Sequence, residues 1–306
     1  MKKRILITGS NGLLGQKLVD LLLPKTEVEI LATSKGANKL AEVYPNLQFQ
    51  NMDITDPADI NRVFESFKPT HIINTAAQTN VDICEDEKQK AVCYLQNATA
   101  VKYLAEACEK HGTHFTHVST DFIFDGENGP YTEEAEAKPV NYYGETKLAG
   151  EEFVKQCKTP WAIARTVVVY GIVHDYGRSN LVLWVKENLE NQKTIQVVND
   201  QFRSPTLAED LAMGCWQIVE KDATGIFNLS GPDFLTPYEM ALQVADYFNL
   251  DKSYIKEASA ANFVQPAKRP PRTGFIIDKA RNALGYEPRT FKEGIKVVAE
   301  QIPAKV

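Results

Sequence analysis

The sequence lacks both a long apolar run and an excess of basic residues. No stretch reaches the roughly 18 consecutive apolar residues of a membrane-spanning helix, so we expect no membrane partner. The 34 Lys and Arg residues are outnumbered by 40 Asp and Glu residues, and the formal net charge of −6 argues against a nucleic-acid partner, which needs a basic footprint. The basic start at residues 1–4 is followed by only four residues before Gly9, too few for the apolar part of a signal peptide. We therefore expect a cytoplasmic protein.

Cysteine is also scarce. The five cysteines are scattered and none forms a C-x-x-C pair; they are Cys84, Cys93, Cys108, Cys157 and Cys215. This pattern favours neither a disulfide framework nor a zinc site, and we expect no metal site. Cys93 and Cys108 fall on the apolar face of one expected helix, where a free thiol behaves as a small hydrophobic residue.

What the sequence does contain is a regular alternation of β-rich runs and amphipathic stretches. Strands are expected at 4–8, 28–33, 47–50, 71–74, 114–119 and 161–166, and helices at 13–23, 56–67, 88–110 and 142–157. This alternation predicts an α/β fold with a doubly wound parallel sheet, whose ligands bind at the carboxyl ends of the strands. We assign the sheet domain to residues 1–170, with 195–228 returning to it, and a smaller C-terminal α/β substrate lobe to 171–194 and 229–306.

A glycine-rich turn joins the first expected strand to the first expected helix. It has the pattern G-x-x-G-x-x-G and consists of Gly9, Ser10, Asn11, Gly12, Leu13, Leu14 and Gly15. The glycines permit a tight turn and a close approach of the backbone, and the start of the helix offers free N–H groups to a pyrophosphate. In this position the pattern predicts a dinucleotide-binding Rossmann domain rather than a plain strand–helix turn.

The ends of the next strands indicate which dinucleotide binds. The acidic residue that would bind the ribose 2′-hydroxyl of NAD is missing after the second strand, which ends in Ser34 and Lys35. Because a hydroxyl beside a lysine suits a 2′-phosphate, we expect NADP(H) to be preferred and NAD(H) to be possible. The alternative is a solvated loop in which Lys35 contacts nothing. Further cofactor-binding candidates are Asp53 and Ile54, near the adenine, and Ala76 and Ala77, near the nicotinamide ribose.

The pair Tyr143 and Lys147 lies four residues apart and therefore on one helical face. An unperturbed tyrosine has a pKa of about 10, and an adjacent ammonium lowers that pKa toward the range that acid–base catalysis uses. Alone, Y-x-x-x-K could be an ordinary amphipathic helix face. Together with the glycine-rich turn and with Ser119-Thr120-Asp121 at a strand end, the pair resembles the catalytic group of the extended short-chain dehydrogenase/reductases.

That resemblance implies a role for each residue. Tyr143 donates a proton to a carbonyl oxygen, Thr120 hydrogen-bonds the same oxygen, and Lys147 supports the phenolate and holds the nicotinamide ribose hydroxyls. Asn97 matches the position of the family's active-site asparagine. Tyr143 and Lys147 thus count as both catalytic and cofactor-binding residues, and a homodimer is an expectation at the level of the family.

Four longer stretches, 76–82, 119–126, 143–151 and 199–206, resemble one branch of that family, the dTDP-4-dehydrorhamnose reductases. The resemblance implies NADPH-driven reduction of a 4-keto sugar nucleotide. Residues near the sugar would be Thr79, Val81, Asp121 and Phe122, with Thr79 also near the cofactor. Two departures from the branch's pattern, at Arg203 and around Arg272, place extra arginines that could pair with a substrate diphosphate. The alternatives for both arginines are a different anionic substrate and a surface charge without a ligand.

Two other functions stay open. The first is a sugar-nucleotide dehydratase or epimerase, although dehydratases carry an Asp-Glu pair after the active-site Thr and here Phe122 follows Asp121. The second is an NADP-binding regulatory subunit resembling that of methionine adenosyltransferase, which belongs to the same fold family and acts by binding a partner enzyme. The sequence does not fix the nucleotide, the sugar, the product stereochemistry, strict use of NADP or the oligomeric state.

Overall fold

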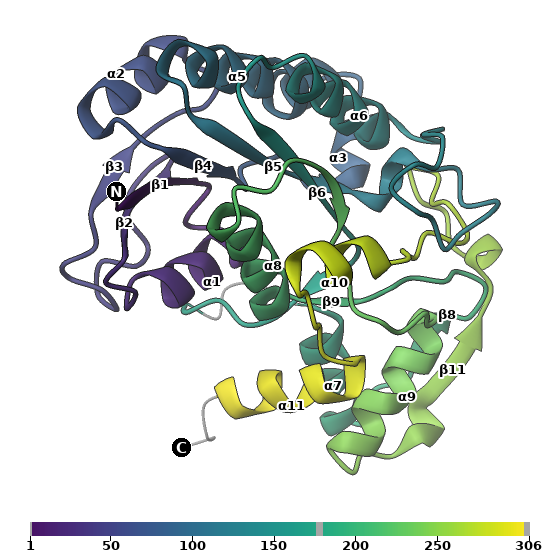
Figure 1. The fold of residues 1–306 in the computed structure, drawn as a ribbon. Coiled ribbons are helices and arrows are strands. Elements are labelled where there is room, and N and C mark those ends of the chain that lie inside the picture. The colour runs from purple at the N-terminus through teal and green to yellow at the C-terminus, as the bar shows by residue number, and fades with distance from the viewer. Residues whose placement is uncertain (1, 176–179, 303–306) are drawn as a thin grey trace.

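The computed structural model describes residues 2–175 and 180–302 and is built around one parallel sheet (Figure 1). Its seven strands are arranged in the order β10-β6-β5-β4-β1-β2-β3. Their bounds are β1 Lys3–Thr8, β2 Val28–Ser34, β3 Phe49–Asn51, β4 His71–Asn74, β5 His114–Thr120, β6 Trp161–Thr166 and β10 Gly225–Asn228. The strand order reverses between β1 and β4, so the predicted doubly wound sheet is confirmed.

Helices cover both faces of this sheet. On one face lie α2 Pro57–Phe67, α5 Ala100–His111 and α6 Tyr142–Lys155, and on the other α1 Leu13–Leu22, α8 Ala208–Glu220 and α10 Asp278–Leu284 (Figure 1). Residues Ile5, Leu6 and Ile7 of β1 are fully buried because a sheet covered on both faces exposes neither side of its central strands. Ile5 and Ile7 pack into the core under α1 and α8, and Leu6 packs into the core under α2 and α5.

The stretch expected as one helix over 88–110 is divided. It consists of α4 Lys90–Tyr94, a π-helical turn Leu95–Thr99 and α5, preceded by the short helix α3 Val81–Glu85. Single π-helical turns inside longer helices are frequent at functional sites, and this one carries Asn97. A short 3₁₀ turn, Asp121–Ile123, follows β5.

A second group of elements packs around its own core below the sheet in Figure 1. It contains α7 Leu181–Glu190, α9 Pro237–Tyr247, α11 Phe291–Gln301 and the two-stranded parallel sheet of β8 Ile195–Val198 and β11 Ile255–Ala258. Two further strands, β7 Val169–Tyr170 and β9 Thr206–Leu207, pair with each other. Within the described ranges, each helix is too short or too polar to cross a bilayer.

The expected path of the chain between these two parts needs correction. Of the segment 195–228, α8 and β10 return to the seven-stranded sheet, but β8 pairs with β11 because Ile195 and Val197 are buried in the core of α7 and α9. Conversely, α10 lies in the stretch we assigned to the lobe, yet Ala280 and Leu284 are buried in the core beside α8.

Candidate active site

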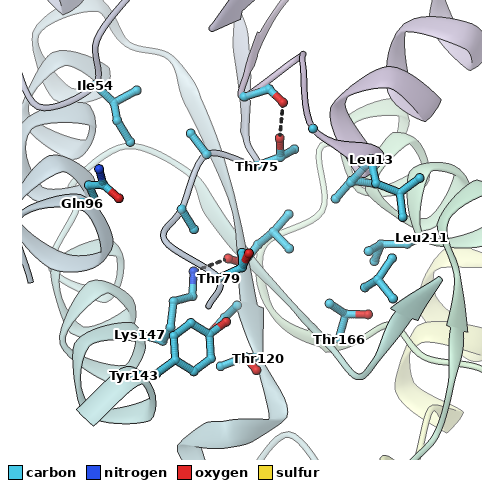
Figure 2. A pocket seen from close by; sticks show the side chains of 18 of the residues that line it. Leu13, Ile54, Thr75, Thr79, Gln96, Thr120, Tyr143, Lys147, Thr166 and Leu211 are labelled. Atoms are coloured by element: carbon cyan, nitrogen blue, oxygen red, sulfur yellow. Dashed lines mark hydrogen bonds between the residues drawn. The ribbon is translucent and has the colours of Figure 1, made fainter. Parts of the chain in front are cut away.

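A cleft of about 550 Å³ opens at the carboxyl ends of the strands, where the fold predicts a ligand (Figure 2). Most of the residues singled out from the sequence line it: Gly9, Gly12, Leu13, Leu14, Ser34, Lys35, Asp53, Ile54, Ala76, Ala77, Thr79, Val81, Thr120, Asp121, Phe122, Tyr143 and Lys147. The structure thus brings the glycine-rich turn and the Tyr143 group into one continuous cleft. Ser10, Asn11, Gly15, Asn97, Arg203 and Arg272 do not line it.

The glycine-rich turn is shaped for close contact. A Cβ atom on Gly15 would lie 2.4 Å from the carbonyl oxygen of Gly9, so α1 can pack this closely on the turn only without a side chain there. Gly12 is the N-cap of α1, and no side chain caps the helix, so its first N–H groups stay open to an anion. Ser10 and Asn11 face away from the cleft: Ser10 is buried, and the Asn11 amide binds the backbone of residues 37 and 39.

Lys35 and Asp53 form an ion pair at the far end of the cleft from Tyr143. Lys35 Nζ lies 2.7 Å from Asp53 Oδ2, and Asp53 Oδ1 accepts hydrogen bonds from the Thr55 backbone N–H at 2.9 Å and hydroxyl at 2.7 Å. The alternative in which Lys35 contacts nothing is therefore wrong. Since the Lys35 side chain is 77% exposed, it stays accessible to an anion that enters the cleft.

Tyr143, Lys147 and Thr120 meet at the other end of the cleft (Figure 2). Tyr143 and Lys147 lie in the first turns of α6, which begins where the Asn141 side chain accepts a hydrogen bond from the Gly144 N–H at 2.8 Å. Gly144 lets α6 approach the end of β5, because a Cβ atom there would lie 2.1 Å from the carbonyl oxygen of Phe122. The Thr120 hydroxyl lies close enough to the phenol of Tyr143 to act on its pKa.

The expected lowering of the Tyr143 pKa by Lys147 is wrong for this structure. Burial and, to a smaller extent, the Asp121 carboxylate raise the pKa of Tyr143 to about 12, although the Thr120 hydroxyl acts in the other direction. Burial also lowers the pKa of Lys147 to about 8, because an ammonium is poorly solvated inside the protein. Desolvation therefore outweighs the attraction that the four-residue spacing suggests, and Tyr143 is held in its protonated form.

Asp121 lies directly behind this group and is buried. Its carboxylate accepts hydrogen bonds from the Thr120 hydroxyl at 3.1 Å and from the Thr273 hydroxyl, while burial raises its pKa. Asp121 therefore fixes the orientation of Thr120 from one side and ties the end of β5 to the segment around Thr273.

Asn97 is buried beside the cleft and does not face it. Its amide donates to the Gln78 carbonyl at 3.0 Å and to the Thr146 hydroxyl at 3.1 Å, and its Oδ1 accepts from the Gln78 N–H at 2.8 Å. The side chain thus joins the segment after β4, which carries Thr79, to the middle of α6. The structure gives Asn97 a positioning role in the free protein.

Arg203 and Arg272 do not line the cleft, although the Arg203 guanidinium lies 5.9 Å from the ring centroid of Phe122, which does. Arg203 is only 4% exposed and donates to the backbone carbonyls of residues 202, 270 and 271, so it is neither a surface charge nor free to bind a diphosphate. The Arg272 guanidinium stacks over Phe202 and Phe234, at 4.4 and 5.1 Å from the ring centroids. Both arginines hold the 270–273 segment against the strand region before β9.

The expectation that the cysteines form no disulfide is wrong at one place. Cys84 of α3 and Cys93 of α4 form a disulfide, with Cα atoms 5.6 Å apart and both side chains buried next to Tyr143. The turn between the two short helices brings the cysteines together. The expected helix over 88–110 contains Cys93 but not Cys84, so it gave no indication of this pairing. Cys108, Cys157 and Cys215 are free, as expected.

Several residues that line the cleft escaped the sequence analysis. Thr166 is the last residue of β6, and Val168 and Val169 come shortly after it. They obey the same rule that found the other strand ends, so the signal was present. Leu211 comes from α8 and reaches the cleft only through tertiary packing, for which the sequence carries no local signal.

Comparison with known proteins agrees with this arrangement. The RmlD substrate binding domain family matches residues 2–303 of the chain. A dTDP-4-dehydrorhamnose reductase of Aggregatibacter actinomycetemcomitans is 32% identical over 305 residues, covering 96% of this chain and 97% of the relative. The methionine adenosyltransferase 2 subunit beta of Mus musculus is 30% identical over 300 residues, covering 96% and 86%.

A solved structure extends the likeness to three dimensions. The dTDP-4-dehydrorhamnose reductase of Bacillus anthracis, in complex with NADP, superimposes with a TM-score of 0.86 at 28% identity, covering 99% of this chain and all of the other. The match over nearly the full length, together with the cleft between the glycine-rich turn and Tyr143, shows that this chain belongs to the RmlD substrate binding domain family.

Proposed function

We propose that the chain is an NADPH-dependent reductase that transfers a hydride to the 4-keto group of a deoxysugar nucleotide, as in dTDP-4-dehydrorhamnose reductases. The observation that carries this proposal is the continuous cleft with a dinucleotide-type glycine turn at one end and Thr120, Tyr143 and Lys147 at the other. The reductase names of the bacterial relatives and the NADP complex of the Bacillus anthracis structure support the same reaction and the same cofactor.

The residues present fit NADP(H). The uncapped start of α1 and the backbone of the glycine-rich turn would hold the pyrophosphate, because the first N–H groups of the helix are open to an anion. The absence of a side chain at Gly15 lets the helix start lie this close to the turn. Ser34 and Lys35 would bind the 2′-phosphate, with Asp53 and Ile54 at the adenine and Ala76, Ala77 and Thr79 toward the nicotinamide. When bound, NADPH supplies the hydride from its nicotinamide ring. NAD(H) would bind at the same place without the contact to Lys35.

The chain's own residues supply the proton and stabilise the charge. Tyr143 is protonated at neutral pH, since burial raises its pKa to about 12, and it donates the phenolic proton to the ketone oxygen as that oxygen gains negative charge. The Thr120 hydroxyl, which donates to Asp121 Oδ1 in this structure, would turn to donate its hydrogen to the same ketone oxygen. Lys147 does not lower the pKa of Tyr143 in the free protein, but a charged Lys147 would attract the phenolate that forms on Tyr143 once the proton has been transferred.

The remaining walls of the cleft would hold the sugar. Thr79, Val81 and Phe122 lie on one side, and Thr166, Val168 and Val169 continue toward the group of elements around β8 and β11. We propose that this second group is the substrate lobe and that it binds the nucleotide part of the substrate. A cytoplasmic homodimer is our expectation from the sequence.

A second candidate function rests on one observation, the 30% identity to the mouse methionine adenosyltransferase 2 subunit beta. A regulatory subunit of that kind would bind its partner enzyme whether or not Tyr143 can donate a proton. Binding to a methionine adenosyltransferase that survives the change Tyr143→Phe, without turnover of any keto sugar, would favour this second function.

The test of the reductase is NADPH oxidation with dTDP-4-dehydrorhamnose, compared between the wild type and two neighbouring variants. Tyr143→Phe removes the proton donor and should lower kcat by about three orders of magnitude or more while changing the Kd for NADPH less than about threefold. Tyr142→Phe is the matched control, because Tyr142 lies on the same helix and does not line the cleft, and it should retain most of the activity. Tyr143→Phe protein with more than about a tenth of the wild-type kcat would contradict the assignment.

A further inference from the structure

A row of buried, hydrogen-bonded polar side chains lies beneath the cleft and ends at Lys147. Thr8, Asn74 and His117 are partners in register on the adjacent parallel strands β1, β4 and β5, so their side chains lie in one row on the same face of the sheet. Thr8 Oγ1 is 2.5 Å from Asn74 Oδ1, the Asn74 amide nitrogen is 3.0 Å from His117 Nδ1, and His117 Nε2 is 3.5 Å from Lys147 Nζ. All four residues are at most 2% exposed.

The imidazole of His117, within this row of side chains, stays neutral. Burial holds the pKa of His117 well below its usual range, and the positive charge of Lys147 acts in the same direction. A neutral imidazole has one nitrogen that donates and one that accepts, whereas an ammonium only donates. When Lys147 is charged, Nε2 of His117 must therefore be the acceptor and the ring hydrogen must lie on Nδ1.

The neighbours of His117 can satisfy that tautomer. A half-turn of the Asn74 amide exchanges its nitrogen and oxygen, so that Oδ1 accepts the hydrogen on Nδ1 and the NH₂ group faces the Thr8 hydroxyl. With the amide nitrogen toward the ring, Nδ1 accepts and Nε2 carries the hydrogen, which suits only an uncharged Lys147. The tautomer of His117 and the charge of Lys147 are consequently coupled.

We propose that His117 is a positioning residue, which accepts a hydrogen bond from the Lys147 ammonium and thereby keeps that group charged and directed at the cleft. A second N–H of Lys147 donates to the Val118 carbonyl at 2.8 Å, and the side chain borders the cleft itself. Because Lys147 is buried, an N–H group that lost its acceptor would penalise the charged form. The consequence for catalysis rests on the proposed function, but the effect on the charge of Lys147 does not.

The other ionisable groups around Lys147 leave this role to His117. Tyr143 and Glu151 lie on the same helix, α6, and the Glu151 carboxylate is held by Arg165 of β6 through bonds of 3.0 and 2.7 Å. Glu151 acts on Lys147 only through its field, which favours the ammonium. Asp121, after β5, acts on Tyr143 and accepts from Thr120. Among the described residues, His117 is thus the ionisable side chain whose hydrogen bond with Lys147 Nζ is direct.

The test is the titration of Lys147 in three proteins, followed by NMR of ¹³C-labelled lysine side chains and assigned with Lys147→Arg. His117→Leu removes the acceptor and should lower the pKa of Lys147 by about one unit, a tenfold shift in its protonation equilibrium. His117→Gln places an amide oxygen near the position of Nε2 and should restore most of that shift. Equal Lys147 titrations in the wild type, the Leu variant and the Gln variant would overturn the proposal.

A measurement on the wild type decides the matter if the Leu variant does not fold. Proton–nitrogen correlation spectra of ¹⁵N-labelled histidine should show His117 neutral with its hydrogen on Nδ1 at pH values at which Lys147 is charged. Hydrogen on Nε2 under those conditions, or a charged imidazole, would overturn the proposal. Neither experiment requires turnover, so both remain decisive if the reductase activity is not found.

The pH dependence of enzyme activity is a further measurement, which a purely structural role of His117 would leave unchanged. If the chain is the proposed reductase, the alkaline limb of the kcat–pH profile should move to lower pH in His117→Leu by the same amount as the Lys147 titration, and His117→Gln should move it back. A His117→Leu profile that is scaled down but not displaced along the pH axis would assign His117 to packing alone.

Discussion

Tyr143 shows why residue types alone do not determine the chemistry of a site. The spacing of Tyr143 and Lys147 correctly places both side chains in one cleft, but the direction of the Tyr143 pKa shift depends on how much water reaches the phenol. Burial by α3, α4 and the end of β5 comes from tertiary packing, which the sequence does not show. The outcome suits a reductase, because a proton donor must be protonated before the reaction begins.

Lys35 offers a test of cofactor choice by a single residue. Its ammonium pairs with Asp53 and borders the cleft, so Lys35→Ala should raise the Kd for NADPH about tenfold and leave the Kd for NADH almost unchanged. The effect should shrink at high salt, because the lysine is exposed. Fluorescence titration with both nucleotides measures it.

Lys39→Ala is the matched control for Lys35. Lys39 belongs to the same loop, pairs with Asp175 at 2.9 Å and does not line the cleft, so its removal should leave both affinities within about twofold of the wild type. Equal losses of NADPH and NADH binding in Lys35→Ala would show that Lys35 shapes the loop rather than reading the 2′-phosphate.

Individual elements could be predicted where the pattern was local. The central strands are short, fully buried apolar runs, and α2 begins with Asp56 as N-cap and a Pro in its first turn, both of which the sequence shows directly. The π-helical turn at Leu95–Thr99 could not be predicted, because its apolar spacing resembles that of a continuous α-helix. The pairing of β8 with β11 joins residues about 60 positions apart, for which alternation within β8 gives no information.

The disulfide between α3 and α4 leads to a prediction at the scale of these elements. Protein purified without reductant and then unfolded should show three reactive thiols, those of Cys108, Cys157 and Cys215. Reduction should lower the free energy of unfolding by about 2 to 3 kcal/mol, the value for a closed loop of roughly ten residues. The double variant Cys84→Ala and Cys93→Ala should be equally unstable with and without reductant. Five reactive thiols in the unreduced protein would contradict the disulfide.

At the scale of the whole molecule, the sequence predicted the sheet, its two layers of helices and the position of the cleft, because strand–helix alternation carries that information over the first 170 residues. It predicted the second half less well. There the chain crosses between two cores, so that α8, β10 and α10 pack with the sheet while β8 packs with α7 and α9. Which core receives a short amphipathic segment depends on partners that are distant in the sequence.

Buried histidines connect the stability of the whole molecule to pH. Burial lowers the pKa of His71 to about 4 and also lowers the pKa of His114 and His117. Between pH 6.5 and pH 4 these histidines therefore bind protons in the unfolded chain but not in the folded chain, and the stability that they contribute falls as the pH falls through this window. His71 alone accounts for a loss of at most about 3 kcal/mol in the free energy of unfolding over this window.

Denaturant unfolding at pH 7.5 and pH 5 measures this linkage. The wild type should be less stable at pH 5, and His71→Gln, which keeps a polar group facing Asp222 but cannot titrate, should lose less stability over the same interval. Carboxylates that are stabilised in the folded state, such as Asp82 beside Arg269, contribute only at lower pH because their ordinary pKa is near 4. Equal losses of stability in the wild type and in His71→Gln over this interval would show that His71 is not held neutral.

The central claim, that the cleft moves a hydride to a sugar ketone, is tested most directly with NADPH carrying deuterium at the transferable position of its nicotinamide. After incubation with dTDP-4-dehydrorhamnose, the account predicts a product with deuterium on carbon 4 of the sugar, formed by the wild type and by Tyr142→Phe and almost absent with Tyr143→Phe. Protein that binds NADPH in this cleft yet transfers no deuterium to this or any other 4-keto sugar nucleotide would contradict the account.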